Sequence, residues 1–511
     1  MTSVDNSDRR FQARRLARQS STLLTSGVFT YAAALLLNVI LARALGPSEF
    51  GAYVVAFSIT NALSLIGLLG VDWIMLRYGS FYEGTSDHPR LRKTFHLGFL
   101  ISGVSLCLTG GILIALSAPT AVHIFHSPAL TTPLRLAGLM VPLLGLTQVM
   151  LYGVQAFKRV KEVAIVSSLL QPLVRIICVV GCLVVVASPT SAFVGLLGSQ
   201  VAVAFMATFV LNRRFPLRGK TAEIPVREMI KFGIPAWGTK LVENLRAQLF
   251  PVILGSIASL SASGIYTASR KIAAAPTAVN NSLNRVYTPI AGDLHLQNRK
   301  EELAALFKNV GKWGFMLAFP LFVFLITFPT DILAIFGEGF SGAESTLVIL
   351  AFAMLFNFLT GPVTSTLILT GRSTAALVDY VIVVVVEISL GLWLIPDHGI
   401  VGAAIAKLVG TAINNIVPLI QVWMSDHMHP FRRDHWKPSI AGISAGALSA
   451  LMIAVIDLDP GVPTAVTGAI ALATIYSLLL ILFRFSVEDK EALVSLLRPG
   501  RKRADETPLS D

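Results

Sequence analysis

Residues 97–116 read LGFLISGVSLCLTGGILIAL, twenty consecutive residues without a charged side chain. A helix that crosses the hydrocarbon core of a bilayer needs about 20 such residues. Residues 31–41 and 381–395 are almost free of charge as well. We therefore expect the chain to cross a membrane repeatedly as α-helices. An outer-membrane barrel is excluded, because its strands alternate apolar and polar residues.

The composition of the whole chain supports this expectation. Of 511 residues, 54% are hydrophobic and 14% are charged, and the mean hydropathy is +0.71. A soluble chain carries about 25% charged residues. The hydrophobic residues, roughly 280 in number, can furnish about fourteen spans of 20 residues. Little chain is then left for a catalytic domain outside the bilayer, which argues against most enzymes.

Apolar segments separated by charged loops divide the chain into fourteen expected spans. Their boundaries are 22–45, 51–71, 95–117, 134–157, 163–187, 192–211, 230–254, 264–289, 310–329, 344–370, 374–395, 399–424, 438–456 and 463–483.

Lysine and arginine alternate between the two sides of this arrangement, which explains much of the net charge of +12. Cytoplasmic loops retain cations. Nearly all loop cations fall in the N-terminus, the C-terminal tail and one set of alternate loops, whereas the opposite loops hold none. We therefore predict a multi-pass protein of the cytoplasmic membrane with both termini in the cytoplasm. The cations thus follow topology, and no basic module for binding nucleic acid is expected.

Two pairs of similar segments indicate an internal repeat. Residues 51–53 (GAY) resemble residues 264–266 (GIY), and residues 193–196 (FVGL) resemble residues 400–403 (IVGA), at offsets of 213 and 207 residues. Six spans per copy give both copies the same orientation, so they are expected to be parallel repeats related by an axis along the membrane normal. The expected organisation is a basic N-terminus, an N-lobe, a linker, a C-lobe, two further helices and a tail, at residues 1–21, 22–211, 212–229, 230–424, 438–483 and 484–511.

Motifs for catalysis, metals and cofactors are scarce. The chain has no Walker A loop, and its histidine clusters lack carboxylates or cysteines at metal-ligand spacing. The three cysteines, Cys107, Cys178 and Cys182, lie in apolar spans, where packing is the better interpretation. We predict no metal site, no cofactor and no enzymatic activity.

The residues that carry functional information are cations inside the expected spans. Exposed to lipid, nine of them would cost roughly 25 kcal/mol at about 2.5 to 3.5 kcal/mol each, so they must face protein or water. Anions at comparable depth are fewer, with Glu243, Asp379 and Glu387 as the main ones. This surplus predicts an electropositive cavity for an anionic substrate. The nine cations are Arg135, Arg175, Lys240, Arg246, Arg270, Lys271, Arg285, Lys312 and Lys407.

Five of these cations occupy the seventh and eighth spans. Lys240, Glu243 and Arg246 are spaced at i, i+3 and share a broad helix face. In the eighth span a polar stripe is interrupted by Pro276, which removes a backbone hydrogen bond and is expected to form a hinge. The stripe consists of Tyr266, Arg270, Thr277, Asn281, Asn284 and Thr288.

Alternatives stay open for several of these residues. Arg246 and Arg285 can instead extend to the membrane interface, and Lys240 can pair with Glu243. Arg270 and Lys271 differ by 100° around the helix, so one of them alone can line the cavity. For Arg135, near a span end, a structural role is favoured, whereas for Arg175 both roles stay open. Asparagines in spans more often join helices than bind ligands.

Several motifs resemble one transporter family. The segment 41–53 (LARALGPSEFGAY) resembles the first extracytoplasmic turn of polysaccharide-biosynthesis transporters that flip lipid-linked O-antigen and exopolysaccharide units. Matches also occur at residues 264–268 (GIYTA), 331–337 (DILAIFG), 369–372 (LTGR) and 399–406 (GIVGAAIA). The resemblance covers residues 22–424. The first span lacks the arginines typical of the lipid II flippase branch, which favours O-antigen or exopolysaccharide over a peptidoglycan precursor.

The resemblance implies the fold of the multidrug/oligosaccharidyl-lipid/polysaccharide exporters, two six-helix lobes in a V around a central cavity with alternating access. It also implies an undecaprenyl-diphosphate-linked oligosaccharide as substrate, with a polysaccharide polymerase and glycosyltransferases as partners.

On this hypothesis the cations bind the diphosphate and the polar groups bind sugars. Coupling to the membrane potential, H⁺ or Na⁺ stays open, with Glu243 or Glu387 as the candidate ion carrier. The expected substrate-binding residues are Lys240, Arg246, Tyr266, Arg270, Lys271, Asn281, Asn284 and Arg285.

Two other functions remain open. A multidrug or cation exporter of the same fold needs acidic residues in its cavity, and the cation surplus opposes it. A polysaccharide polymerase or ligase needs a long extracytoplasmic catalytic loop, whereas the longest one expected here has about fifteen residues, close to an ordinary long connection.

Overall fold

The computed structural model describes residues 4–157, 159–214, 219–431, 433–456 and 458–483. The expected C-terminal tail, residues 484–511, therefore lies outside the described residues. Within those ranges every regular element is a helix. The described residues therefore have the all-α membrane fold that the sequence predicts.

The first group of helices, the N-bundle, comprises α1 (Val4–Leu68), α2 (Val71–Gly84), α3 (His88–Pro119), α4 (Thr131–Ala156), α5 (Val160–Ala164), α6 (Gln171–Val185) and α7 (Pro189–Arg214). The second group, the C-bundle, comprises α8 (Val226–Ile257), α9 (Leu260–Ala273), α10 (Thr277–Leu296), α11 (Lys300–Thr327), α12 (Pro329–Leu333), α13 (Glu344–Leu359), α14 (Val363–Leu369), α15 (Ser373–Asp426), α16 (Trp436–Ile456) and α17 (Val462–Leu482). Short π or 3₁₀ turns join them, among them η3 (Ile165–Leu170), η4 (Ala334–Phe336) and η5 (Glu338–Phe340).

The helices account for the fourteen expected spans. In the described residues, nine helices are long and apolar enough to cross a membrane, and the bent pair α13–α14 makes ten. Two of these, α1 and α15, each contain two spans joined at a glycine with positive φ, Gly46 (φ 70°) and Gly399 (φ 52°). Helix α8 and the pair α9–α10 are more polar and complete the fourteen.

Three spans differ from the continuous helices expected from the sequence. The eighth is broken between Ala273 and Thr277, so that Pro276 caps α10 instead of kinking one helix. The tenth is broken between Leu359 and Val363 and bends by 42°. The fifth contains the π-helix η3, a local widening that often marks functional sites. Irregular backbone at membrane depth is tolerated where it lines a cavity.

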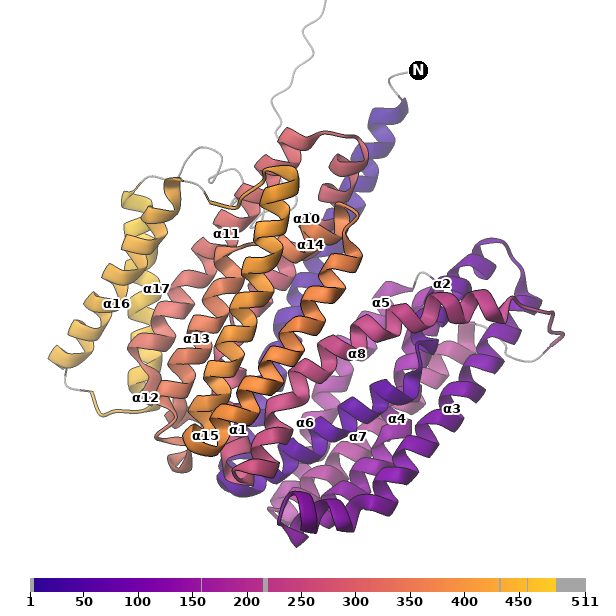
Figure 1. The fold of residues 1–511 in the computed structure, drawn as a ribbon, viewed down its shortest axis with the longest axis horizontal. Helices are drawn as coiled ribbons and strands as arrows, with labels where there is room; N and C mark the ends of the chain where they lie inside the picture. The colour runs from indigo at the N-terminus through magenta and orange to yellow at the C-terminus, as the bar shows by residue number, and fades with distance from the viewer. Residues whose placement is uncertain (1–3, 158, 215–218, 432, 457, 484–511) are drawn as a thin grey trace, which may run out of the picture.

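The two bundles form the arms of a V in Figure 1, converging near the labels α1 and α15 and diverging toward the marked N-terminus. We call these the narrow end and the wide end. Helix α8 joins the arms. Its first half contacts the N-bundle, where Trp237 donates a 2.7 Å hydrogen bond to the Leu65 carbonyl, and its second half packs Phe250 against Gly391. Helices α16 and α17 pack on α11, and the Tyr476 hydroxyl donates a hydrogen bond to the Met316 carbonyl.

Two glycines let the bundles touch at the narrow end. A Cβ built on Gly51 would lie 1.7 Å from the Leu260 carbonyl oxygen, and one built on Gly264 would lie 2.4 Å from the Pro47 carbonyl oxygen. Only glycine permits such a backbone approach. Gly51 and Gly264 are the equivalent positions of the repeat detected in the sequence, so the two copies meet through matching residues.

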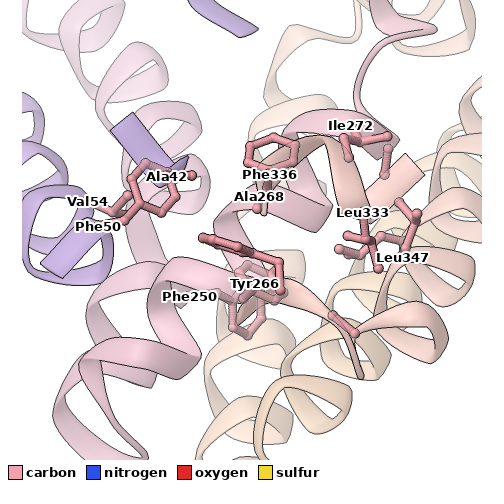
Figure 2. Packing of buried hydrophobic residues seen from close by; sticks show 14 of the residues in the cluster. Ala42, Phe50, Val54, Phe250, Tyr266, Ala268, Ile272, Leu333, Phe336 and Leu347 are labelled. Carbon is pink, nitrogen blue, oxygen red and sulfur yellow. The ribbon is translucent and has the colours of Figure 1, made fainter. Parts of the chain in front are cut away.

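A large apolar cluster closes the V beside these glycines. Phe50 of α1 lies 6.1 Å from Phe340, ring centre to ring centre, and Phe340 lies 5.7 Å from Phe336. Figure 2 shows Phe50 and Val54 at the left of the cluster, Phe336 and Ala268 at its centre, and Leu333 and Leu347 at its right. We call this cluster the seal. Its buried aromatic rings exclude water between the bundles at the narrow end.

Candidate functional site

Lys240 is neutralised by an aspartate that was not expected from the sequence. Its Nζ lies 2.8 Å from Oδ2 of Asp72, a residue of α2 that is 1% exposed. Gln148 donates a 3.2 Å hydrogen bond to the same oxygen. The expected alternative pairing with Glu243 is therefore wrong. Asp72 falls in a loop of the expected arrangement, in which the second span ends at residue 71, although apolar residues continue on both sides of it.

Replacing Asp72 with asparagine is expected to destabilise the protein. Removing one partner of a fully buried ion pair costs roughly 3 to 5 kcal/mol, and the cost here is smaller because the Lys240 side chain that loses its partner is 26% exposed. Asp72→Asn should lower the thermal unfolding temperature of the purified protein in detergent, and Asp72→Asn with Lys240→Gln should recover part of the loss. If Asp72→Asn unfolds at the same temperature as wild type, the Asp72–Lys240 ion pair does not stabilise the fold.

Glu387 pairs with two other cations. This fully buried carboxylate on α15 lies 2.9 Å from Nη2 of Arg246 and 3.2 Å from Nζ of Lys407. Arg246 thereby joins α8 to α15. Both cations contact Oε1, whereas Oε2 of Glu387 is buried without a hydrogen bond.

Two cations lie outside the interior between the bundles. Arg135 donates a 3.3 Å hydrogen bond to Ser117, in agreement with the structural role favoured for it, and Lys312 lies 3.8 Å from a carboxylate oxygen of Asp434.

Three cations without an acidic partner gather in a central cavity between the bundles. The cavity has a volume of about 240 Å³ and is bordered by α1, η3, α6, α8 and α9. Arg175 enters it from α6, and Arg270 and Lys271 enter it from α9. In the described residues none of the three forms an ion pair, and Nε of both arginines is buried without a hydrogen bond. The cavity is therefore electropositive, with donors free for an anion.

Helix geometry explains why both neighbouring cations reach the cavity. Thr267, Arg270 and Lys271 are spaced at i, i+3 and i+4, so the two cations flank the face centred on Thr267. The alternative in which one of them alone lines the cavity is thereby wrong. Beside them, the Tyr31 hydroxyl donates to the Lys271 carbonyl and fixes the end of α9 against α1.

A larger cavity leads away from the central one. It has a volume of about 640 Å³ and shares Thr30, Ala34 and Ser167 with the central cavity. Asn281 of the polar stripe lines it together with Arg285 of the same helix, α10, and both residues are exposed. We call this cavity the vestibule. Thr30 donates to the Ser168 carbonyl of η3, so the π-helix forms part of the wall.

A third cavity, of about 430 Å³, lies within the C-bundle and shares Arg270 with the central cavity. Asn284 and Glu243 line it. Arg270 therefore stands at the boundary between two polar spaces. We call this third space the C-bundle cavity.

Tyr266 does not line these cavities. It is 0% exposed, and its ring lies 5.8 Å from that of Phe250 between the centroids. Figure 2 shows both rings inside the apolar cluster. The expectation that Tyr266 contacts a sugar is incorrect for this conformation, because the helix face of Tyr266 packs on α8.

Comparisons with known proteins agree with this architecture. The family model described as polysaccharide biosynthesis protein matches residues 16–295. The probable flippase AglR of Haloferax volcanii is 25% identical over 302 residues, covering 57% of this chain and 60% of that protein. The teichuronic acid biosynthesis protein TuaB of Bacillus subtilis is 27% identical over 165 residues, or 32% of each chain. The chain thus spans less than two thirds of either relative.

Solved structures share the fold. The lipid II flippase MurJ in an inward closed conformation matches with a TM-score of 0.70 at 13% identity, over 90% of this chain and 98% of that one. An inward-facing multidrug transporter of the MATE family matches with a TM-score of 0.59 at 13% identity, over 81% of this chain and 94% of that one. At these identities the likeness concerns the fold alone.

Proposed function

The chain belongs to the polysaccharide biosynthesis protein family, and we propose on this premise that it is a flippase for a polyprenyl-diphosphate-linked oligosaccharide. The observation that carries the proposal is the central cavity, where Arg175, Arg270 and Lys271 face an enclosed space. None of the described residues that line this space is acidic. A diphosphate offers two adjacent anionic groups that such a set of donors can bind together.

The relatives support the same substrate class. AglR is named a probable flippase, and TuaB is named for the biosynthesis of teichuronic acid. In our proposal the cargo enters from the cytoplasm through the vestibule, where Arg285 and Asn281 guide it. Its diphosphate then binds in the central cavity, and opening of the seal releases it on the other side. The undecaprenyl chain stays in lipid between the bundles.

The cations named from the sequence divide into two roles. We propose that Arg270 and Lys271, joined by Arg175, hold the diphosphate. Lys240 and Arg246 instead hold α8 between the bundles through Asp72 and Glu387. The break at Pro276 separates α9, which is fixed at the seal, from α10, which lines the vestibule. It is our candidate hinge.

A drug or cation exporter is the second candidate function, favoured by the MATE-like fold. Recognition of an organic cation needs a carboxylate in the binding space, and Glu243 of the C-bundle cavity is available for it. The cationic lining of the central cavity opposes this function.

Deleting the gene distinguishes these functions. Loss of a flippase should remove the surface polysaccharide and cause the lipid-linked glycan to accumulate with its sugar facing the cytoplasm. Loss of a drug exporter should instead raise drug sensitivity with the polysaccharide intact, and this second outcome would refute our proposal. The proposal also includes glycosyltransferases and a polysaccharide polymerase as partners of this protein at the cytoplasmic membrane.

We propose the membrane potential as the driving force. An inside-negative potential favours outward movement of an anion by about 2.3 kcal/mol per charge per 100 mV. In vesicles with a potassium diffusion potential, outward transfer should therefore be faster at inside-negative than at zero potential. If the transfer rate is independent of the membrane potential but requires Na⁺ or a pH gradient, transport is coupled to that ion instead. Glu243, a carboxylate without an ion pair among the described residues, is then the candidate ion-binding residue.

A further inference from the structure

The C-bundle cavity has a lining unlike that of the central cavity. It is enclosed by α8, α9, α10, α13, α14 and α15, and it is rich in amides and hydroxyl groups. Five asparagines border it together with Tyr380 and Ser365. Its cations Arg246 and Lys407 are balanced by two carboxylates, Glu387, which pairs with both of them, and Glu243, which lies in the same lining. The space is therefore suited to a polar, hydroxyl-bearing ligand more than to a second anion.

Two of its asparagines are used by the protein itself. Asn415 donates a 3.0 Å hydrogen bond to Asn357 and accepts a 2.8 Å hydrogen bond from Thr360. Asn284 differs, because its side-chain amide donates a long 3.4 Å hydrogen bond to Asn280 while its Oδ1 is buried without a hydrogen bond. Such an acceptor is costly inside a membrane protein unless something donates to it.

Glu243 adds a second open acceptor. It lies on α8 at the same cavity, and in the part of the chain that the structure describes it forms no ion pair. A carboxylate accepts hydrogen bonds from two neighbouring hydroxyl groups. Glu243 and Asn284 thus present acceptors from two different walls, α8 and α10, to one space.

The broken tenth span supports a binding role for this space. Gly361, with φ of +61°, and Pro362 interrupt the helix between α13 and α14, and both line the cavity. Irregular backbone in a membrane protein is tolerated where it is buried in protein or lines a cavity. The break brings irregular backbone to the wall of the cavity, where the Gly361 carbonyl accepts a hydrogen bond from the Val363 N–H and the Pro362 carbonyl accepts one from the Thr366 N–H.

We infer that the C-bundle cavity is the subsite for the sugar joined to the diphosphate, with Glu243 and Asn284 accepting hydrogen bonds from its hydroxyl groups. The inference rests on the proposed function, because Arg270 borders both cavities and a diphosphate bound to it would place the attached sugar beside the second space. The two cavities then bind the two chemical parts of one ligand. Specificity for the glycan lies in the C-bundle.

The test compares two kinds of ligand on the purified full-length protein in detergent. Undecaprenyl diphosphate is one probe, and undecaprenyl diphosphate carrying N-acetylglucosamine or galactose is the other. Native mass spectrometry gives the affinity of each for wild type, Glu243→Gln and Asn284→Leu. Glu301→Gln, an exposed carboxylate at the start of α11, is the matched control.

We expect Glu243→Gln and Asn284→Leu to weaken binding of at least one sugar-bearing probe about tenfold, since one or two hydrogen bonds are lost. Binding of bare undecaprenyl diphosphate and the unfolding temperature should stay as in wild type. Equal weakening of all probes, or no weakening, overturns the assignment of the sugar subsite. If wild type fails to bind bare undecaprenyl diphosphate, the proposed function itself falls, and the subsite with it.

Discussion

Replacing Arg270 and Lys271 together with alanine is expected to abolish surface polysaccharide in a deletion strain that carries the variant gene. Both residues line the central cavity and form no ion pair within the described part of the chain. In the proposed function each truncation removes a desolvated charge that holds the diphosphate, so we expect a loss of about 2 to 5 kcal/mol in binding free energy. That corresponds to about 30-fold or more in affinity per residue.

The matched control replaces another pair of consecutive cations, Arg299 and Lys300. Both are exposed at the wide end, and Arg299 pairs with the exposed Glu302. Their joint replacement with alanine should leave surface polysaccharide unchanged. Immunoblotting of membranes must show wild-type amounts of both variants. Normal polysaccharide in the Arg270/Lys271 variant would rule out the central cavity as the anion site.

Arg175→Ala should give a partial version of the same defect. Its guanidinium enters the cavity from α6 of the N-bundle, whereas the other two cations come from α9 of the C-bundle. A diphosphate bound by all three joins the bundles. The variant is therefore expected to bind the diphosphate more weakly and to change between conformations more slowly. Its surface polysaccharide should lie between the level of wild type and that of the Arg270/Lys271 variant.

The second large effect is expected at the glycine contact of the narrow end. Gly51→Ala places a methyl group where the Leu260 carbonyl oxygen lies 1.7 Å away. Backbone atoms of two packed helices cannot yield as a flexible side chain would, and overpacking costs about 1 to 3 kcal/mol or more. The variant should therefore open the narrow end and lose transport, because alternating access needs both conformations.

Thiol labelling detects this opening. In a chain whose three native cysteines are replaced with alanine, Val54→Cys introduces a buried thiol at the seal. A membrane-impermeant maleimide added outside should label it in the Gly51→Ala background and not in the wild-type background. Gly103→Ala on α3, where a Cβ meets open space, is the control. Equal labelling in both backgrounds would mean that the glycine contact does not hold the seal.

Much of the fold follows from patterns that the bilayer imposes. Apolar stretches such as residues 97–116 form helices as expected, and the matching glycines Gly51 and Gly264 already indicate a repeat in the sequence. Helix breaks are harder to predict. Pro276 suggests a kink, whereas nothing in the sequence distinguishes a kink from the full break between α9 and α10.

The site is predictable in part, for a physical reason. The cost of a cation in the membrane identifies Arg175, Arg270 and Lys271 as special, but it cannot say which cations have partners. Partners come from helices distant in sequence, as Asp72 does for Lys240. Periodicity likewise places Tyr266 on a polar stripe without showing that α8 covers that face.

The most direct measurement uses unilamellar vesicles that contain only this protein and undecaprenyl-diphosphate-linked galactose. Galactose oxidase added outside reacts only with sugar on the outer leaflet. With the wild-type protein we expect all of the probe to become oxidised, because sugar from the inner leaflet is moved outward. With the Arg270/Lys271 variant, oxidation should stop at the level of protein-free vesicles. If wild-type vesicles also stop at that level, the protein is not a flippase for this class of lipid.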